Sequence, residues 1–303
     1  MKNYLKILTE NYLSRRSKAE KEAFRTFVEK ECQAHDVPCQ VDVADGNHNI
    51  VIGDISRADV IFTAHYDTPA RSFYPNLLVP TNRLFRLFYH LTIPVLMALI
   101  SLLASYYLEK WLGFGNIGLL WTYLLLYFGT FFVLTRAFPN KNNYNDNTSG
   151  VATILELAMS GQGYACVLFD NEEKGLLGSK AFAKKYCDQM AEKTILNFDC
   201  VGDGRHFIFV YKPTVEQGEV HQALAHGFTN TDTFSVHFYS SKKASCKSDQ
   251  KNFPCSIGVV ACHKVRGIGY CAARIHTNRD VICQSENIEF LVSNVLKSFP
   301  LDR

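Results

Sequence analysis

Residues 60–67, VIFTAHYD, are a short apolar run that ends in a histidine and an aspartate. Two further runs, residues 165–169 (ACVLF) and 194–198 (TILNF), have the same character. Continuous runs of this kind are typical of strands that are buried on both faces of a mainly parallel sheet. The sequence therefore predicts three buried strands at these positions.

Helical and turn signals lie around the three predicted strands. Residues 18–34, 149–160 and 178–190 repeat their apolar positions with the period of a helix. Residues 40–54 predict two strands around a turn at Asp45–Gly46. The alternation of strands and helices predicts an α/β fold, in which a mainly parallel mixed sheet is sandwiched by helices.

The composition is that of a folded chain with little net charge. Of 303 residues, 47% are hydrophobic and 20% are charged, and the net charge is +3. These values exclude a disordered chain, and the small charge without a basic stripe argues against a nucleic-acid partner. The ten cysteines include no CxxC pair, which is typical of reduced thiols in a cytosol-facing protein.

The excess hydrophobicity is concentrated between residues 84 and 138. Residues 87–108 are 22 consecutive positions without a formal charge, and residues 117–134 are 18 more. Because a helix rises about 1.5 Å per residue, each segment is close to the ~30 Å needed to cross a bilayer core. We therefore predict that residues 84–138 form a transmembrane helical hairpin with a turn over 109–116. The hairpin would be inserted in a domain made of residues 1–83 and 139–303.

The alternative is that the two segments are buried core helices of a soluble protein. Two consecutive helices that are apolar on all sides would need a very large core. The remaining roughly 250 residues are too few to enclose them and also form a core of their own.

The distribution of basic residues predicts the side of the membrane on which the domain lies. An even number of spans leaves both flanks on one side, and only Lys110 lies in the connecting loop. The positive-inside rule then predicts an integral membrane protein with two spans and a cytoplasmic domain. The flanking basic residues are Arg71, Arg83, Arg86, Arg136 and Lys141.

Histidine and carboxylate side chains follow each predicted buried strand. His65 and Asp67 follow the first, Glu172 and Glu173 follow the second, and Asp199 follows the third. Ligands of open α/β sheets bind outside the carboxyl ends of the strands, so these side chains would share one crevice. A single acidic residue there is commonly a helix cap or a solvated turn, but the coincidence at three strands favours a metal site.

Two more segments would add ligands to this crevice. Asp146 lies just before a predicted helix, which Thr148 or Ser149 would cap, so its carboxylate would be free to point into the crevice. His276 lies in a late polar loop. Alone it would be a surface or core histidine, but here it would supply the second imidazole.

Five segments follow one another in an order that matches a known family. They are FTAHYDTP (62–69), NDNTSGVA (145–152), NEEKGLLGS (171–179), NFDCVGDG (197–204) and IHTNRD (275–280). Together they resemble the zinc aminopeptidases of the M28 type, whose relatives include glutaminyl cyclases and transferrin-receptor-like ectodomains. The resemblance implies a zinc-exopeptidase fold and a peptide substrate.

The resemblance also implies a site that holds two Zn²⁺ ions per chain. Asp146 would bridge the two ions. His65 and Asp199 would complete the protein ligands of one ion, and Glu173 and His276 would complete those of the other. Such a site supplies the mixed nitrogen and oxygen ligands that zinc prefers.

The catalytic residues that the resemblance implies are Glu172 and Asp67. Glu172 resembles the general base, and Asp67 resembles the carboxylate that orients His65. The peptide bond between Asp146 and Asn147 is expected to be cis. One departure from the family pattern is Gln250, which stands where a histidine is usual and bears on substrate contacts rather than on metal binding.

Three functions are compatible with these residues. The favoured one is a membrane-anchored dinuclear zinc exopeptidase, an aminopeptidase, which contacts the bilayer through residues 84–138. The alternatives are a glutaminyl cyclase-like acyltransferase, whose relatives use one zinc, and a non-catalytic membrane scaffold or receptor, whose ligand sets are typically broken.

Some polar residues have no assigned role. Lys264, Arg266 and Arg274 are either solvated surface charges or ligands of a substrate carboxylate. Tyr239 and Tyr270 are candidate oxyanion donors.

Overall fold

A nine-stranded mixed sheet organises the chain, which the computed structural model describes from residue 3 to residue 300. The strand order is β1-β2-β4-β3-β5-β8-β6-β7, and β9 pairs with β8. The central strands β4, β3, β5 and β8 run parallel, and antiparallel pairs join them to the outer strands. The predicted mixed α/β sheet is confirmed. The strands are β1 (Cys39–Ala44), β2 (Asn47–Ile52), β3 (Val60–His65), β4 (Ala165–Phe169), β5 (Thr194–Phe198), β6 (His206–Tyr211), β7 (Ser235–Ser240), β8 (Ser256–Val265) and β9 (Gly269–Cys271).

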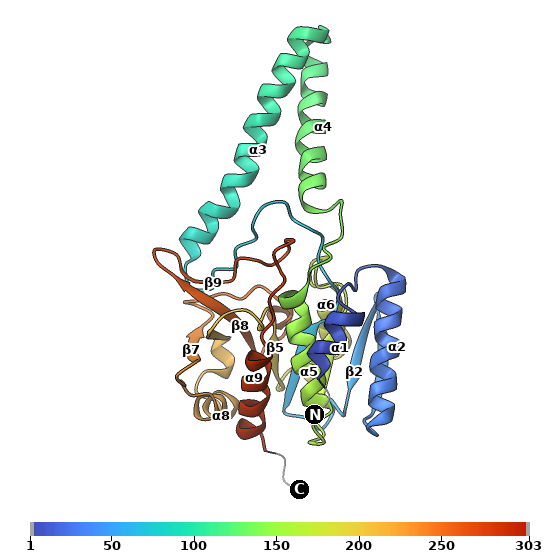
Figure 1. The fold of residues 1–303 in the computed structure, drawn as a ribbon, viewed down its shortest axis with the longest axis vertical. Coiled ribbons are helices and arrows are strands. Elements are labelled where there is room, and N and C mark those ends of the chain that lie inside the picture. The colour runs from blue at the N-terminus through green and yellow to red at the C-terminus, as the bar shows by residue number, and fades with distance from the viewer. Residues whose placement is uncertain (1–2, 301–303) are drawn as a thin grey trace.

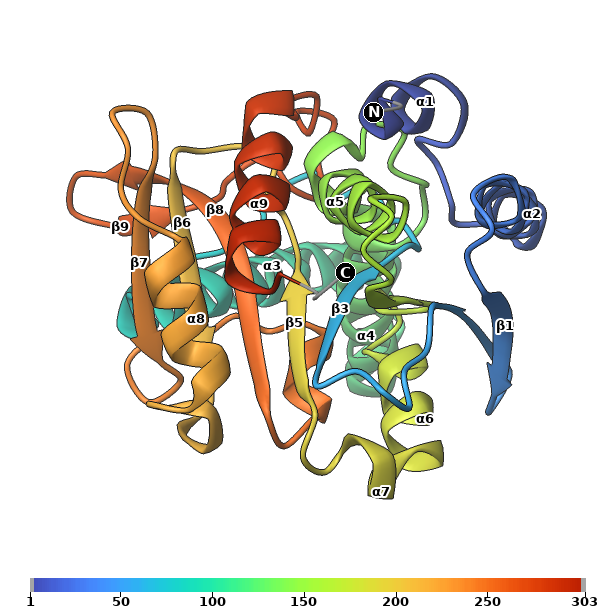
Figure 2. The ribbon, with the colours of Figure 1, turned by 90° about the horizontal axis from the view of Figure 1, so that it is seen from below.

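Helices cover both faces of the sheet (Figure 2). Helices α1, α5, α8 and α9 contribute to the core on one face, whereas α6 and α7 contribute to the core on the other. The helices of the domain are α1 (Tyr4–Asn11), α2 (Lys18–Ala34), η1 (Tyr144–Ser149), α5 (Gly150–Ala158), α6 (Leu177–Lys185), α7 (Cys187–Met190), η2 (Pro213–Val215), α8 (Glu219–Gly227), η3 (Asp249–Asn252) and α9 (Ser285–Ser298).

The central strands divide their side chains between these two cores. On β3, Phe62 belongs to the core that includes α5, and Ile61 belongs to the core that includes α6. On β4, Leu168 and Val167 divide in the same way. Because neighbouring residues of a strand point to opposite faces, a strand covered on both sides needs an unbroken apolar run. This explains why each of the three predicted runs is apolar almost throughout.

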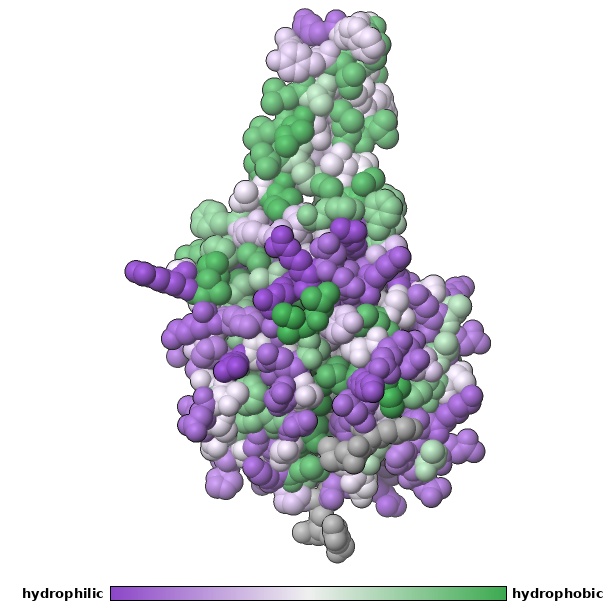
Figure 3. All heavy atoms as spheres, in the orientation of Figure 1, coloured by the Kyte–Doolittle hydropathy of each residue, from purple (hydrophilic) through white to green (hydrophobic). Residues whose placement is uncertain are grey.

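Two long helices, α3 (Arg83–Leu112) and α4 (Gly115–Thr135), leave the domain together as a hairpin (Figure 1). Both are long and apolar enough to cross a membrane, and only 11% and 0% of their most apolar windows are buried. They are therefore not core helices of the domain. Figure 3 shows apolar residues gathered along the projection and hydrophilic ones over the domain.

The ends of two predicted helices differ from expectation. Helix α3 continues to Leu112 and ends at Gly113, whose φ of 68° is the left-handed conformation that commonly ends helices. The expected turn over 109–116 is therefore much shorter, and Trp111 lies on the last turn of α3. The predicted helix over 178–190 is divided, because α6 ends at Lys185 and α7 begins at Cys187.

A buried ion pair fastens α2 to the sheet. Lys21 Nζ lies 2.5 Å from Asp170 Oδ1, and it also donates to Asn171 Oδ1 at 2.7 Å. We expect Lys21→Ala to lower the free energy of unfolding by about 3–5 kcal/mol, because it leaves the Asp170 carboxylate buried without its cation. Chemical denaturation in detergent measures the change, with Lys30→Ala on the exposed face of the same helix as the control. Equal denaturation midpoints for the two variants would contradict the prediction.

Candidate metal centre and active site

Three adjacent strands deliver the candidate residues to one edge of the sheet. His65 ends β3, and its register partner Phe169 ends the neighbouring strand β4. Glu172 and Glu173 follow β4 after a short turn, and Asp199 directly follows β5. Because parallel strands present their carboxyl ends at the same edge, these segments meet in one crevice, as predicted.

Asp146 reaches the crevice from the short turn η1. The carboxylate of Asp280 accepts hydrogen bonds from the main-chain N–H groups of Asn145 at 2.8 Å and Asp146 at 3.0 Å. The side-chain amide of Asn147 donates to the carbonyl of Phe198, at the end of β5, at 3.0 Å. The peptide bond between Asp146 and Asn147 is cis, as expected. These contacts hold Asp146 between the late loop and the end of β5.

The start of α5 is not capped by the hydroxyl of Thr148 or Ser149, contrary to expectation. Asn147 Oδ1 accepts the N–H of Gly150 at 3.0 Å, and the Ser149 hydroxyl donates to the carbonyl of Asn145 at 2.7 Å. Gly150 must lack a side chain, because an added Cβ would lie 2.4 Å from the last main-chain oxygen of β5. The close packing of α5 on β5 places the start of this helix beside the crevice.

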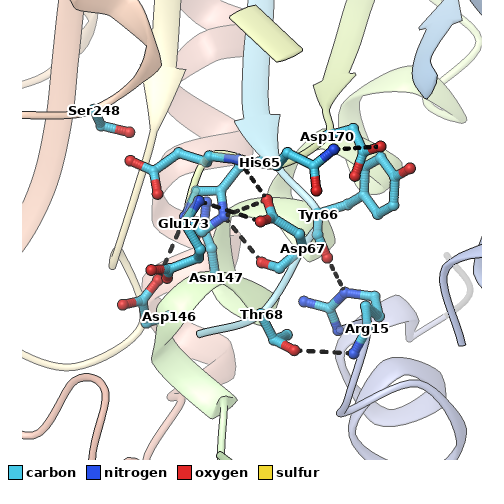
Figure 4. Close-up of polar contacts among 12 residues, drawn as sticks. Arg15, His65, Tyr66, Asp67, Thr68, Asp146, Asn147, Asp170, Glu173 and Ser248 are labelled. Atoms are coloured by element: carbon cyan, nitrogen blue, oxygen red, sulfur yellow. Dashed lines mark hydrogen bonds and ion pairs between the residues drawn. The ribbon is translucent and has the colours of Figure 1, made fainter. Parts of the chain in front are cut away.

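Two imidazoles, of His65 and His276, converge on the carboxylate of Asp146; Figure 4 shows the His65 imidazole together with Asp146 and Glu173. His65 Nε2 lies 3.4 Å from Oδ1, and His276 Nε2 lies 2.9 Å from Oδ2. His65 Nε2 also lies 3.6 Å from Asp199 Oδ1, and His276 Nε2 lies 3.3 Å from Glu173 Oε1. Two groups of donor atoms therefore share Asp146, and the five side chains lie together.

The donor set fits zinc. Ligand atoms at neighbouring corners of a tetrahedral zinc site are about 3.3 Å apart when the bonds are ~2.0–2.1 Å long. The separations above lie close to this value. The groups His65–Asp146–Asp199 and Asp146–Glu173–His276 each bring one ligand atom per residue within 4.8 Å of the others. Within residues 3–300, Glu173 Oε1 is buried and accepts no hydrogen bond, although the His276 imidazole lies 3.3 Å from it, so it has a lone pair available to a metal ion.

Asp67 fixes both the imidazole and the two glutamates. His65 Nδ1 lies 3.0 Å from the main-chain carbonyl of Asp67 and 3.5 Å from its carboxylate. A proton on Nδ1 therefore leaves the Nε2 lone pair for a metal ion. The Asp67 carboxylate accepts the main-chain N–H groups of Glu172 at 2.9 Å and Glu173 at 3.2 Å. Asp67 thus orients His65 mainly through its main chain, and its side chain holds the glutamates.

Burial and mutual repulsion shift the pKa values of the acidic groups. Burial raises the pKa of Glu172 well above its ordinary value, and the charges of Glu173, Asp249 and Asp199 add to this effect. Burial alone would also raise the pKa of Asp146, but the two neighbouring imidazoles hold it well below its usual range. Asp146 therefore stays ionised between the two imidazoles.

The pKa values of the two imidazoles are raised by the same carboxylates. Burial alone would lower the pKa of His65, yet Glu172 and the other surrounding carboxylates raise it well above its ordinary value. The pKa of His276 is raised in the same way by Glu173 and Asp146. The cluster of carboxylates therefore attracts positive charge to the crevice.

Arg15 is a buried residue beside the site that could not be selected from its sequence context. It is fully buried, and its guanidinium donates to the carbonyl of Tyr66 at 2.5 Å and to Thr148 Oγ1 at 3.1 Å. Its main-chain N–H donates to Thr68 Oγ1 at 3.0 Å (Figure 4). Burial lowers the pKa of Arg15 to about 10. Arg15 joins the segment after β3 to the turn that carries Asp146.

The base of the hairpin forms part of the cavity over the site. A cavity of about 210 Å³ is lined by the candidate ligands together with Arg86 and His90 of α3 and Lys247 of a nearby loop. A second cavity of about 190 Å³ shares Glu173, His276 and His90 with the first, and it is also lined by residues of α4. The hairpin residues were not selected from the sequence, because a charge at the start of an apolar segment is also typical of a simple membrane anchor.

Other residues that the sequence analysis named do not line the cavity. The side chain of Gln250 is buried. Its Oε1 accepts a hydrogen bond from Asn197 Nδ2 at 3.1 Å, and its Nε2 donates one to the carbonyl of Cys246 at 2.9 Å. Arg274 forms an ion pair with Asp203 at 2.5 Å. Lys264, Arg266, Tyr239 and Tyr270 are also absent from the lining of either cavity.

Solved structures with the same architecture are zinc exopeptidases and glutaminyl cyclases. A Zn-dependent exopeptidase from Parabacteroides distasonis superposes with a TM-score of 0.58 and 17% identity, covering 97% of this chain and 94% of that one. The glutaminyl cyclase of Bacteroides thetaiotaomicron gives 0.61 and 14%, with coverages of 99% and 96%. The LapA aminopeptidase of Legionella pneumophila gives 0.57 and 12%, with coverages of 97% and 69%. At these identities the likeness shows the fold alone.

Sequence comparison identifies the family. No curated protein sequence matches the chain. The model of peptidase family M28 matches residues 137–289, which include four of the five candidate ligands and the candidate base Glu172. This match covers half of the chain, and the fold agrees with it. The chain therefore belongs to peptidase family M28.

Proposed function

We propose that this M28 protein is a membrane-anchored zinc exopeptidase that holds two zinc ions and removes residues from the amino end of peptides. The observation that carries the proposal is the shared carboxylate of Asp146, whose two oxygens face His65 and His276 at 3.4 and 2.9 Å. His65 and Asp199 would hold one ion, and Glu173 and His276 would hold the other. Bound zinc would polarise the carbonyl of the scissile bond and lower the pKa of water.

The chain's own residues would carry the proton. Glu172 lies within 4.8 Å of the ligand atoms of His65 and Glu173, and the Asp67 carboxylate fixes its main chain. In this position Glu172 would take a proton from the attacking water and pass it to the leaving amine. Burial raises the pKa of Glu172 and the neighbouring carboxylate of Glu173 adds to this effect, so the Glu172 carboxylate would be a stronger base than an exposed glutamate.

The membrane anchor is the hairpin of α3 and α4. Its exposed apolar surface, with no packing partner in residues 3–300, supports insertion into a bilayer. The basic residues on both flanks support a cytoplasmic location for the domain. Because residues at the domain-side ends of α3 and α4 line the cavities, the active site would lie close to the membrane surface.

Peptide hydrolysis by the purified full chain in detergent tests this function. We expect zinc-loaded protein to release single residues from peptides with a free amino end, and a chelator to abolish the release. Peptides with an acetylated amino end are the matched control and should remain intact. Cleavage of acetylated and free peptides at the same rate would reject the aminopeptidase assignment.

A glutaminyl cyclase-like acyltransferase is the second candidate, and it is favoured by the likeness to the Bacteroides thetaiotaomicron enzyme. The two reactions differ in their products. A peptide that begins with glutamine would lose its first residue to a peptidase, whereas a cyclase would retain that residue as a ring and release ammonia. Mass spectrometry of the product separates the two outcomes.

A further inference from the structure

We propose that the site selects substrates that carry a free carboxylate beside the scissile bond, and that Arg86 and Lys247 bind this carboxylate. The inference rests on the proposed peptidase function, since it names the substrate class of the same site. Arg86 lies on the first turns of α3, and Lys247 lies in the loop between β7 and η3. Both line the cavity that contains His65, Asp146 and Glu172.

The two cations have no acidic partner. No ion pair within residues 3–300 includes Arg86 or Lys247, although four carboxylates line the same cavity. Arg86 is only partly exposed, and an arginine with few water contacts gains much from a planar anion. Among residues 3–300 these two cavity-lining cations are therefore unpaired and available to a ligand.

The loop that carries Lys247 also positions Arg86. Arg83 Nη2 donates to the carbonyl of Ser241 at 2.5 Å, and Arg86 Nη1 donates to the carbonyl of Ser245 at 3.1 Å. These bonds fasten the first turn of α3 to the loop over residues 241–247. The remaining guanidinium N–H groups of Arg86 have no partner within residues 3–300, so they are free to bind a carboxylate.

The lining of the cavity combines residues of opposite charge. The candidate ligands supply its acidic part, whose charge zinc would largely neutralise, and Arg86 and Lys247 supply its basic part. A cavity of about 210 Å³ is small enough to enclose one residue beside the ions. The second cavity passes Glu173 and His276 and reaches Phe131, Thr135 and Arg136 at the end of α4. The terminal residue would occupy the first cavity, and the rest of the substrate would leave through the second.

The carboxylate can come from two parts of a peptide. It is either the side chain of an acidic terminal residue or the α-carboxylate of a dipeptide. Two matched pairs of probes separate these sources: Glu-Ala-Ala amide with Gln-Ala-Ala amide, and Ala-Ala with Ala-Ala amide. Within each pair only the carboxylate is replaced by its neutral amide.

Substitution of the two cations tests the proposal in the full chain. We expect one acid probe to be hydrolysed with a higher kcat/KM than its amide, and Arg86→Gln to reduce that ratio by about 10- to 100-fold, because a charge-assisted bond is lost. Lys247→Gln should reduce the same ratio, and Arg86→Glu should invert it. Lys243→Gln is the matched control, because Lys243 is exposed on the same loop and does not line the cavity.

Binding separates failure of this inference from failure of the proposed function. Calorimetric titration of the zinc-loaded Glu172→Gln variant with the four probes needs no turnover, so it reports carboxylate selection even if the reaction is not hydrolysis. Tighter binding of one acid than of its amide, lost in Arg86→Gln with zinc retained, supports the proposal. Equal affinities for acid and amide in both pairs would overturn it. So would a defect of Arg86→Gln confined to binding of vesicles that contain anionic lipid.

Discussion

Replacement of Glu172 with glutamine is expected to lower the rate of peptide hydrolysis by about 10²- to 10⁴-fold while zinc stays bound. Glutamine has the same shape, but it cannot take a proton from water. The five candidate ligands do not include Glu172, so the metal content should not change. Initial rates with a peptide that has a free amino end, and zinc content measured on the same sample, test both parts of the expectation.

Two further variants complete this test. Lys174→Gln changes an exposed neighbour of the two glutamates and should leave the rate within a factor of about two, since surface substitutions have small effects. Glu172→Asp keeps the carboxylate but withdraws it from the cavity, so its rate should fall between those of the wild type and Glu172→Gln. Turnover of Glu172→Gln at the wild-type rate would show that another group is the base.

Replacement of Asp146 should remove metal ions and activity together. Its two oxygens face different imidazoles, so Asp146→Ala takes one ligand from each of the two donor groups. We expect zinc content to fall from about two equivalents to below one, and hydrolysis to fall by more than about 10³-fold, because the ions supply several kcal/mol of transition-state stabilisation. Elemental analysis and initial rates measure the two effects.

Asp146→Ala also removes side-chain volume from the turn, so a second variant controls for the change in shape. Asp146→Asn keeps the volume of the side chain and should lose zinc as well, because a neutral amide is a poor bridging ligand. Asp188→Ala removes an exposed aspartate from α7 and should keep the wild-type zinc content. Retention of all zinc in both Asp146 variants would contradict the shared-ligand arrangement.

The central sheet and the positions of His65 and Asp199 at its edge could be predicted from the sequence for one physical reason. A strand buried on both faces must be apolar almost throughout, and a polar residue directly after it has to face the edge where the strands end. His65 and Asp199 occupy these positions after β3 and β5. His276 lies in a loop without periodicity, so only its order relative to the other four segments, as in the M28 family, indicated its role.

The second half of the sheet was not predicted. Strands β6 and β7 lie near the edge, and β7 is only partly buried along most of its length, so its pattern is weaker than that of a central strand. Arg15 could not be selected either, because a lone arginine near the start of a chain is usually exposed. Its burial depends on Tyr66 and Thr148, which are far from it in the sequence.

The hairpin was predicted to be a membrane anchor, and in the structure it also lines part of the candidate active site. The ends of α3 and α4 that adjoin the domain lie apart, and the two helices converge toward the turn that joins them (Figure 1). Residues of both of these ends line the cavities next to His276 and Glu173. The sequence separates the hairpin from the ligand segments by its composition. The fold shows which residues of these helices line the cavities beside the candidate ligands.

The zinc content of the wild-type chain shows directly whether the site holds two metal ions. After purification in detergent, loading with zinc and dialysis, elemental analysis should find about two zinc ions per chain, as a site with a bridging carboxylate requires. A single tightly held ion would contradict the dinuclear centre and favour the cyclase-like alternative. No bound zinc at all would contradict the metal site itself.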